Sequence, residues 1–260
     1  MVGTFRLLPL PDTPPTVQAW CHGVPGAVSS PHLMVPFWYP SIVIWREWAQ
    51  NGEVANVRLC FHGPQPKAYV FKPESSVDLI GIAFAPELAQ RMLGVSNTEL
   101  AGQIIDWCDT RYDYAVGLAS RGSDASHVAE VMANAVLHGS DERATDEIDH
   151  EIEHAIAIIR RTQGAASLRA IRERIEISER RFRTRFKDRI GTSAKEYSKL
   201  LRANALVGCA DRQGNPNWAA LSQRFGYFDQ AHMINDLRKL TGLSPVRLLA
   251  ERQAEGKSTL

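Results

Sequence analysis

Residues 218–242 read Trp218-Ala-Ala-Leu-Ser-Gln-Arg-Phe-Gly226 and then Tyr227-Phe-Asp-Gln-Ala-His-Met-Ile-Asn-Asp-Leu-Arg-Lys-Leu-Thr-Gly242. This stretch predicts two short helices joined by a tight turn. Gly226 supplies a left-handed turn residue at little cost, and Asp229 is a good N-cap for the second helix, residues 230–241. Met233 and Leu237 lie four residues apart and are expected to hold that helix against a core.

The first turn of helix 230–241 carries side chains suited to the edges of DNA bases. They are Gln230, Ala231, His232 and, one turn on, Asn235. Gln and Asn pair bidentately with adenine, and an Ala methyl group can meet the methyl group of thymine. This composition is typical of a helix that reads the major groove.

An earlier segment, residues 168–191, has the same plan. Ile171 and Ile175 give its first helix an apolar face, and Ser178 can cap a second helix over residues 179–190, anchored by Phe182 and Phe186. The outward positions of this second helix are nearly all cationic: Arg180, Arg181, Arg183, Thr184 and Arg185. Between the two segments, residues 194–207 predict one continuous helix that fixes how the helix pairs sit relative to each other.

These motifs resemble a known family. The runs Gly226-Tyr-Phe-Asp-Gln-Ala-His-Met233 and Leu237-Arg-Lys-Leu-Thr-Gly-Leu-Ser-Pro245 resemble the signature of the AraC/XylS transcription regulators. Ser178-Glu-Arg-Arg-Phe182 and Ser193-Ala-Lys-Glu-Tyr197 are similar to their first helix-turn-helix and the start of their linker helix. The resemblance covers roughly residues 147–250. It implies a sequence-specific DNA-binding regulator whose two recognition helices enter successive major grooves, about 34 Å apart.

The resemblance also implies individual contacts. Base contacts would fall on Arg180, Arg183, Thr184, Gln230, Ala231, His232 and Asn235. Phosphate contacts, which position a protein without reading sequence, would fall on Lys195, Arg202, Arg238 and Lys239. The first helix pair departs from the family pattern, since Arg172 replaces a small Ala and Glu176 replaces the turn glycine. A positive φ at Glu176 costs on the order of 1 kcal/mol, so we expect the first turn to be reshaped.

Charge separates the chain into two parts. The 260 residues carry a formal net charge of +1, yet residues 151–260 hold 21 Lys and Arg against 12 Asp and Glu, or +9. Residues 1–150 hold 9 against 17, or −8. The uncharged stretch 13–45 contains six prolines and is therefore not predicted to span a membrane. The scattered Cys21, Cys60, Cys108 and Cys209 are interpreted as free thiols, and a cytoplasmic location is expected.

Up to about residue 84 the chain is rich in short β-prone runs broken by Gly and Pro. They are Ile42 to Trp48, Val54 to His62, Ala68 to Phe71 and Val77 to Phe84. They predict a small β-sandwich or barrel, followed by helices, one of which opens with a capping box at Ser96 and Glu99. The expected fold is α+β. Its regions are a β-rich regulatory, effector-binding or dimerisation domain over 1–138, a linker over 139–146 and an AraC-type DNA-binding domain over 147–260.

Aromatic residues of the first domain suggest a hypothesis for an effector pocket, lined by Trp38, Tyr39, Trp45 and Trp48. The alternative is that these rings pack in a core or lie on the surface. Besides double-stranded DNA, the candidate partners are a small-molecule effector, RNA polymerase and a second copy of the chain. No membrane partner is expected.

Two other functions compete with DNA recognition. The pairs Cys21-His22 and Cys60-Phe-His62 offer the thiolate and imidazole ligands of a tetrahedral zinc enzyme, although neither has the spacing of a zinc knuckle. A basic helical surface can also bind a protein. The chain contains no Gly-x-Ser-x-Gly elbow and no glycine-rich phosphate loop, so we predict no enzyme activity, no cofactor and no metal.

Overall fold

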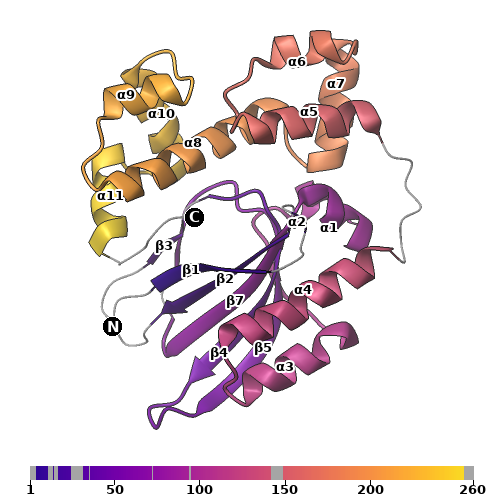
Figure 1. Ribbon diagram of the computed structural model, residues 1–260, viewed down its shortest axis with the longest axis vertical. Helices are drawn as coiled ribbons and strands as arrows, with labels where there is room; N and C mark the ends of the chain where they lie inside the picture. Colours follow the sequence, from indigo (N-terminus) through magenta and orange to yellow (C-terminus); the bar gives the residue numbers. More distant parts are fainter. Residues whose placement is uncertain are drawn as a thin grey trace.

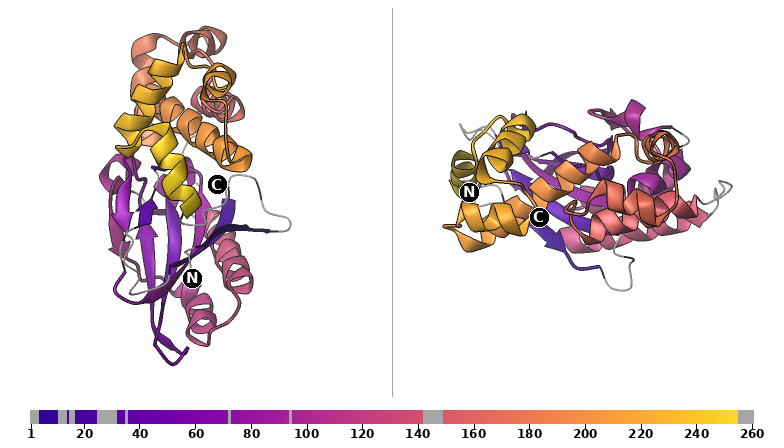
Figure 2. Two further views of the ribbon diagram at one scale, coloured as in Figure 1. Left: turned by 90° about the vertical axis from the view of Figure 1, so that its left-hand side faces the viewer. Right: turned by 90° about the horizontal axis from the view of Figure 1, so that it is seen from above.

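The structure is a computed structural model that describes residues 4–10, 14, 17–24, 32–34, 36–71, 73–93, 95–141 and 149–254. Figure 1 shows a β-sheet with helices on one face and a group of helices beyond one end of the sheet. The two views of Figure 2 show the same stacking from the side and from above. The predicted α+β fold class is therefore confirmed.

We call the described residues up to 141 the first part of the chain and those from 149 to 254 the second part. Antiparallel strands build the sheets of the first part. A six-stranded sheet has the order β1-β2-β7-β4-β5-β8, and a two-stranded sheet pairs β3 with β6. The strands are β1 (Thr4–Leu8), β2 (Val17–Val24), β3 (His32–Met34), β4 (Ser41–Trp48), β5 (Val54–His62), β6 (Tyr69–Phe71), β7 (Ser76–Phe84) and β8 (Ile104–Asp106). The four β-prone runs correspond to β4, β5, β6 and β7.

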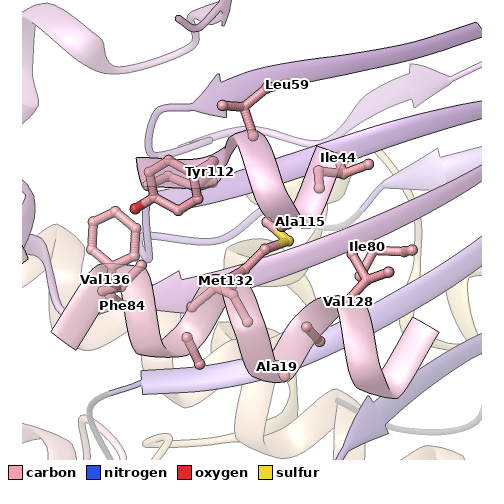
Figure 3. Close-up of a cluster of buried hydrophobic side chains, with 14 of the residues drawn as sticks. Ala19, Ile44, Leu59, Ile80, Phe84, Tyr112, Ala115, Val128, Met132 and Val136 are labelled. Carbon is pink, nitrogen blue, oxygen red and sulfur yellow. The ribbon is translucent and has the colours of Figure 1, made fainter. Parts of the chain in front are cut away.

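The core of this part lies between the six-stranded sheet and two helices. Ile44 in the central strand β4 pairs with Leu59 of β5 on one side and with Ile80 of β7 on the other, and all three side chains are buried. Figure 3 shows these residues facing Met132 of α4 and Ala115 of α3. Alternation along each strand turns this row of apolar side chains toward the helices.

In the part of the chain that the structure describes, five helical segments follow β7, with strand β8 between the second and the third. They are α1 (Pro86–Leu93), α2 (Asn97–Leu100), the 3₁₀ turn η1 (Thr110–Tyr112), α3 (Asp113–Ser120) and α4 (Ala125–Asp141). The predicted capping box is present, because Ser96 and Glu99 each bind the other's backbone N–H. Residues 139–141 of the expected linker form the last turn of α4, and residues 142–146 lie outside the described residues.

Among the described residues from 149 to 254, seven helices form the second part. They are α5 (His150–Arg161), α6 (Leu168–Arg174), α7 (Glu179–Ile190), α8 (Ala194–Gln213), α9 (Trp218–Arg224), α10 (Gln230–Thr241) and α11 (Pro245–Ala254). We call α6 and α7 the first unit and α9 and α10 the second unit. The long helix α8 joins the two units, as predicted, and contributes to the core of each.

The topology separates the proposed zinc ligands. Cys21 and His22 lie on β2, whereas Cys60 and His62 lie on β5. Strands β7 and β4 intervene, so the two pairs are three strand spacings, about 14 Å, apart in the sheet. Within the described ranges no cluster of His, Cys, Asp and Glu has the arrangement of a metal site. Among the same residues, no helix is long and apolar enough to cross a bilayer.

Candidate nucleic-acid interface

The turns of the two units begin with the same backbone geometry. In the first, Glu176 has φ 54° and the Ile177 N–H donates to the Arg172 carbonyl at 3.4 Å. In the second, Gly226 has φ 73° and the Tyr227 N–H donates to the Ser222 carbonyl at 2.9 Å. The turn expected to be reshaped thus keeps its left-handed residue, with Glu176 in the strained conformation that glycine adopts freely.

Each second helix of a unit is capped at its start. The Ser178 hydroxyl accepts the Arg181 N–H at the start of α7, and the Asp229 carboxylate accepts the His232 N–H at the start of α10. These caps satisfy N–H groups that have no partner inside the helix. The bounds of both helices, 179–190 and 230–241, are those predicted.

Buried side chains hold the inner face of each second helix. Phe182 and Phe186 of α7 pack with ring centroids 5.6 Å apart, and Phe186 also contacts Tyr197 of α8. Met233 and Leu237 of α10 are fully buried. The opposite faces of α7 and α10 are consequently turned to solvent.

The predicted base contacts of α7 lie on its exposed face. Arg180, Arg183 and Thr184 are all exposed. The Arg183 side chain is 76% exposed and forms a 2.7 Å ion pair with Glu179, one turn earlier. Such a surface pair contributes only about 0.3–0.5 kcal/mol, so a DNA base can displace it readily.

Two further arginines of α7 are used inside the domain. Arg185 binds the carboxylates of Asp149 and Glu151 at the start of α5, and its hydrogen bonds to Asp149 raise the pKa of the guanidinium above its ordinary value. Arg189 is 12% exposed and binds Glu153 at 2.8 Å. These pairs fix α7 against α5, and the sequence alone did not indicate them.

The predicted base contacts of α10 lie in its first two turns. Gln230, Ala231 and Asn235 are exposed. The His232 side chain is 42% exposed, but its Nδ1 accepts the Phe228 N–H at 3.4 Å and its Nε2 lies 3.4 Å from the Asp236 carboxylate. His232 therefore has to exchange one of these contacts before its ring can bind a base.

The predicted phosphate contacts fall into two groups. Lys195, Arg238 and Lys239 are exposed. Arg202 instead donates to the carbonyls of Gly164 and Gly226, and its guanidinium lies over the Tyr227 ring. It braces α8 against the end of α5 and against the second turn, so its donors already have acceptors within the domain.

Residues 171–251 match a protein-family model described as a helix-turn-helix domain. These residues form an AraC-type helix-turn-helix domain. The resemblance stated from the sequence is thereby confirmed over this range. So is the predicted function, that of a DNA-binding transcription regulator.

Three solved structures illustrate what the chain is similar to. The crystal structure of ToxT from Vibrio cholerae O395 has 7% identity and a TM-score of 0.48, over 91% of this chain and 98% of that chain. A 1.65 Å structure of ToxT from Vibrio cholerae has 9% identity and a TM-score of 0.49, over 91% and 98%. The xylose-binding transcription activator xylR has 14% identity and a TM-score of 0.32, over 48% of this chain and 39% of that chain. A comparison with curated protein sequences gives no match.

The four aromatic residues predicted to line an effector pocket have separate partners. Trp38 is buried against helices of the second part, and the Arg160 guanidinium of α5 lies over the Tyr39 ring. Trp45 donates to His62, and Trp48 donates to Asp78. A pocket of about 240 Å³ is lined by Trp38 but not by the other three.

Sequence reasoning missed one exposed residue at the start of α10. The second turn contains one residue more than the first, because Asp229 rather than the residue equivalent to Ser178 is the N-cap. The extra residue is Phe228, whose side chain is 92% exposed. A signal in the sequence could have identified Phe228. It is an apolar residue next to a polar recognition helix, and it does not belong to the helical period of apolar residues that predicts the core.

Proposed function

We propose that the chain recognises a specific DNA sequence by placing α7 and α10 in two successive major grooves on one side of a duplex. The observation that carries this proposal is the equivalence of the two units. Each has a capped helix with buried anchors on one face and exposed polar side chains on the other, and α8 joins them. Helix α8 has 20 residues and is about 30 Å long, close to the 34 Å between successive grooves.

Direct base recognition is proposed for the exposed side chains of α7 and α10. Arg180 and Arg183 suit guanine O6 and N7, and Gln230 and Asn235 suit adenine. Thr184 and Ala231 offer methyl groups to thymine. His232 is included as the residue that first gives up its contact with Asp236 or Phe228.

Phosphate binding is proposed for Lys195, Arg238 and Lys239, which are exposed. Arg202 is left out of this set because its donors are directed at two backbone carbonyls. Each phosphate that these lysines and Arg238 neutralise releases a counterion, so affinity should fall steeply with salt. The slope of log affinity against log salt is about −0.9 per contact.

Selection of bound fragments from random duplexes, followed by sequencing, tests this function. We expect an enriched motif with two conserved blocks whose centres are about 10 base pairs apart, because one helical turn separates the two grooves. Random DNA bound with equal affinity, or no DNA retained at all, would contradict the proposal. If no DNA is retained, the alternative of a helical protein-interaction module is favoured.

A small-molecule effector is the second candidate function, and the pocket beside Trp38 favours it. The pocket lies where the two parts of the chain meet, and its lining includes Lys67 from the first part with Lys199 and Lys239 from the second. Its volume of about 240 Å³ is just below the usual range for ligand sites, about 300–1,000 Å³, so we propose a small ligand. A ligand screen followed by Trp fluorescence tests this, with Trp38→Phe as the control. If no compound of the library changes the Trp fluorescence or the melting temperature, the proposal of a small-molecule effector is contradicted.

The other partners follow from the DNA-binding role. We propose a cytoplasmic location, where the chain has access to DNA, and a function without catalysis. RNA polymerase and a second copy of the chain stay predictions, to be tested by co-purification and by sedimentation of the free protein and its DNA complex.

A further inference from the structure

The two units of the AraC-type domain have cores of different origin. The second core consists of residues from 203 to 249, all within the domain. The first core consists of residues from α5 to α8 together with Trp38, which comes from the segment before β4. Trp38 is 6% exposed and is the buried member of this core that lies in the first part of the chain. Ala101 of the first part and Leu240 of α10 pack against the same core. Among the described residues, the first unit thus has a core that the domain does not complete by itself.

Trp38 contacts the C-terminal end of recognition helix α7. Its indole Nε1–H donates to the carbonyl of Ile190, the last residue of α7, at 2.8 Å. The last carbonyls of a helix have no partner within it and need donors from elsewhere. The large apolar ring and the donor of Trp38 therefore both act on the same helix end.

Helix α2 holds the next residue of the chain. The Thr98 hydroxyl donates to the carbonyl of Gly191, the C-cap of α7, at 2.7 Å. Gly191 has φ 89°, and a Cβ atom there would lie 2.5 Å from Cβ of Asn97. Figure 1 shows this end of α7 approaching α1 and α2. The C-terminal end of α7 is therefore packed tightly against the first part of the chain.

The second unit meets the first part at the end of α10, where Leu240 packs against the core that contains Trp38. The Ala68 N–H donates to the Leu240 carbonyl near the end of α10, at 3.0 Å. The 240 Å³ pocket lies at this contact, between Lys67 and Lys239. The described residues place no side chain of the first part in the second core.

We infer that the first part of the chain positions α7 through Trp38, whereas the first two turns of α10 are held in their reading position by Met233 and Leu237, which lie in a core of their own domain. This inference rests on the proposed reading of DNA by both helices and adds that the two are regulated unequally. A state of the first part that withdraws Trp38 would loosen the reading of one half of the DNA site and preserve the other. Trp38 is thus a positioning residue for α7, distant from the DNA itself.

Amide hydrogen exchange of the full-length protein, without DNA, gives the first test. In Trp38→Ala we expect the amides of residues 182–191 to exchange at least tenfold faster, while those of 233–237, in the first turns of α10, keep their wild-type rates. Thr98→Val, which removes one hydrogen bond and preserves the shape of the side chain, should show a smaller effect in the same segment. Trp48→Phe is the matched control, because the Trp48 indole binds Asp78 within the first part. Unchanged exchange of α7 in both variants would overturn the inference, whether or not the chain reads DNA.

Binding to the enriched duplex, and to versions with one block scrambled, gives the second test. The α7 block is the half of the site at which Arg183→Ala changes the base preference. Scrambling this block should strongly weaken binding by the wild-type protein but only slightly weaken binding by Trp38→Ala. Scrambling the α10 block should weaken both proteins equally. If Trp38→Ala weakened the reading of both blocks to the same degree, the residue would support the whole domain and the inference would be wrong. Failure of the proposed function would leave no enriched duplex, and the exchange experiment alone would then decide.

Discussion

Arg183 and Lys239 are both exposed cations on recognition helices, but they are expected to contact different parts of DNA. A guanidinium that binds guanine discriminates against other bases by about 1–3 kcal/mol, whereas an ammonium on a phosphate has no such preference. Arg183→Ala should therefore relax preference at one base pair. Lys239→Ala should weaken specific and random duplexes alike and make the salt slope shallower by about 1. Competition binding against single-base-pair variants at several salt concentrations measures both effects. Equal losses on specific and random DNA would show that Arg183 contacts a phosphate.

His62 gives the first part of the chain a pH-dependent stability. The ring is buried, and its Nε2 accepts the Trp45 indole N–H at 2.9 Å. Burial lowers its pKa from 6.5 to about 4. Between pH 6.5 and about 4, the unfolded chain therefore binds a proton at His62 that the folded chain does not bind. The stabilisation is complete above pH 6.5 and is lost as pH falls toward 4.

Replacement of His62 by Gln should remove this dependence, because the amide oxygen can still accept the indole N–H. Between pH 7 and pH 5 we expect the wild-type free energy of unfolding to fall by about 2 kcal/mol more than that of His62→Gln. Urea unfolding followed by Trp fluorescence measures the difference, and other titrating groups cancel because both proteins share them. Parallel curves for the two proteins would mean that the ring is accessible to protons in the folded state.

At the scale of elements, the two turns form a natural comparison. Glu176 and Gly226 occupy equivalent positions with φ 54° and 73°. Glu176→Gly should raise the free energy of unfolding by about 0.5–1 kcal/mol, because glycine adopts a left-handed conformation without steric strain. Gly226→Ala should lower it by about 1–2 kcal/mol, since the new Cβ also lies 3.2 Å from Cβ of Ala165. Thermal unfolding of both variants tests this, and destabilisation by Glu176→Gly would indicate that the glutamate side chain has a stabilising role of its own.

These helices could be predicted because their signals are local. Ser178 and Asp229 cap α7 and α10, and the apolar anchors recur within each helix, so the ends of both helices follow from neighbouring residues. The partners of Arg185 and Arg202 could not be predicted in this way. They lie 36 and 38 residues away, at Asp149 and Gly164, where only the folded arrangement of α5, α7 and α8 brings them together.

Trp38 shows the same limit for the molecule as a whole. Its hydrogen bond to Ile190 spans 152 residues of sequence. Aromatic composition alone suggested an effector pocket with Trp45 and Trp48, since an indole near others in sequence is equally suited to a pocket or to a core. The positive net charge of residues 151–260 correctly indicated the DNA-binding part. Net charge carries no information about packing, so it could not predict that Trp38 enters a core of the second part.

The rigid connection between the units makes a prediction about the spacing of the DNA site. Helix α8 is continuous over 20 residues, and Arg202 ties it to the second turn and to the end of α5. Inserting 5 base pairs between the two blocks turns one of them to the opposite side of the duplex. Inserting 10 base pairs restores the side but adds about 34 Å, more than the whole length of α8, which is about 30 Å. Both insertions should therefore reduce affinity to that of a single block, as measured by titration of the lengthened duplexes. Recovery of affinity at 10 base pairs would mean that the two blocks are read by different copies of the chain or through a hinge in α8.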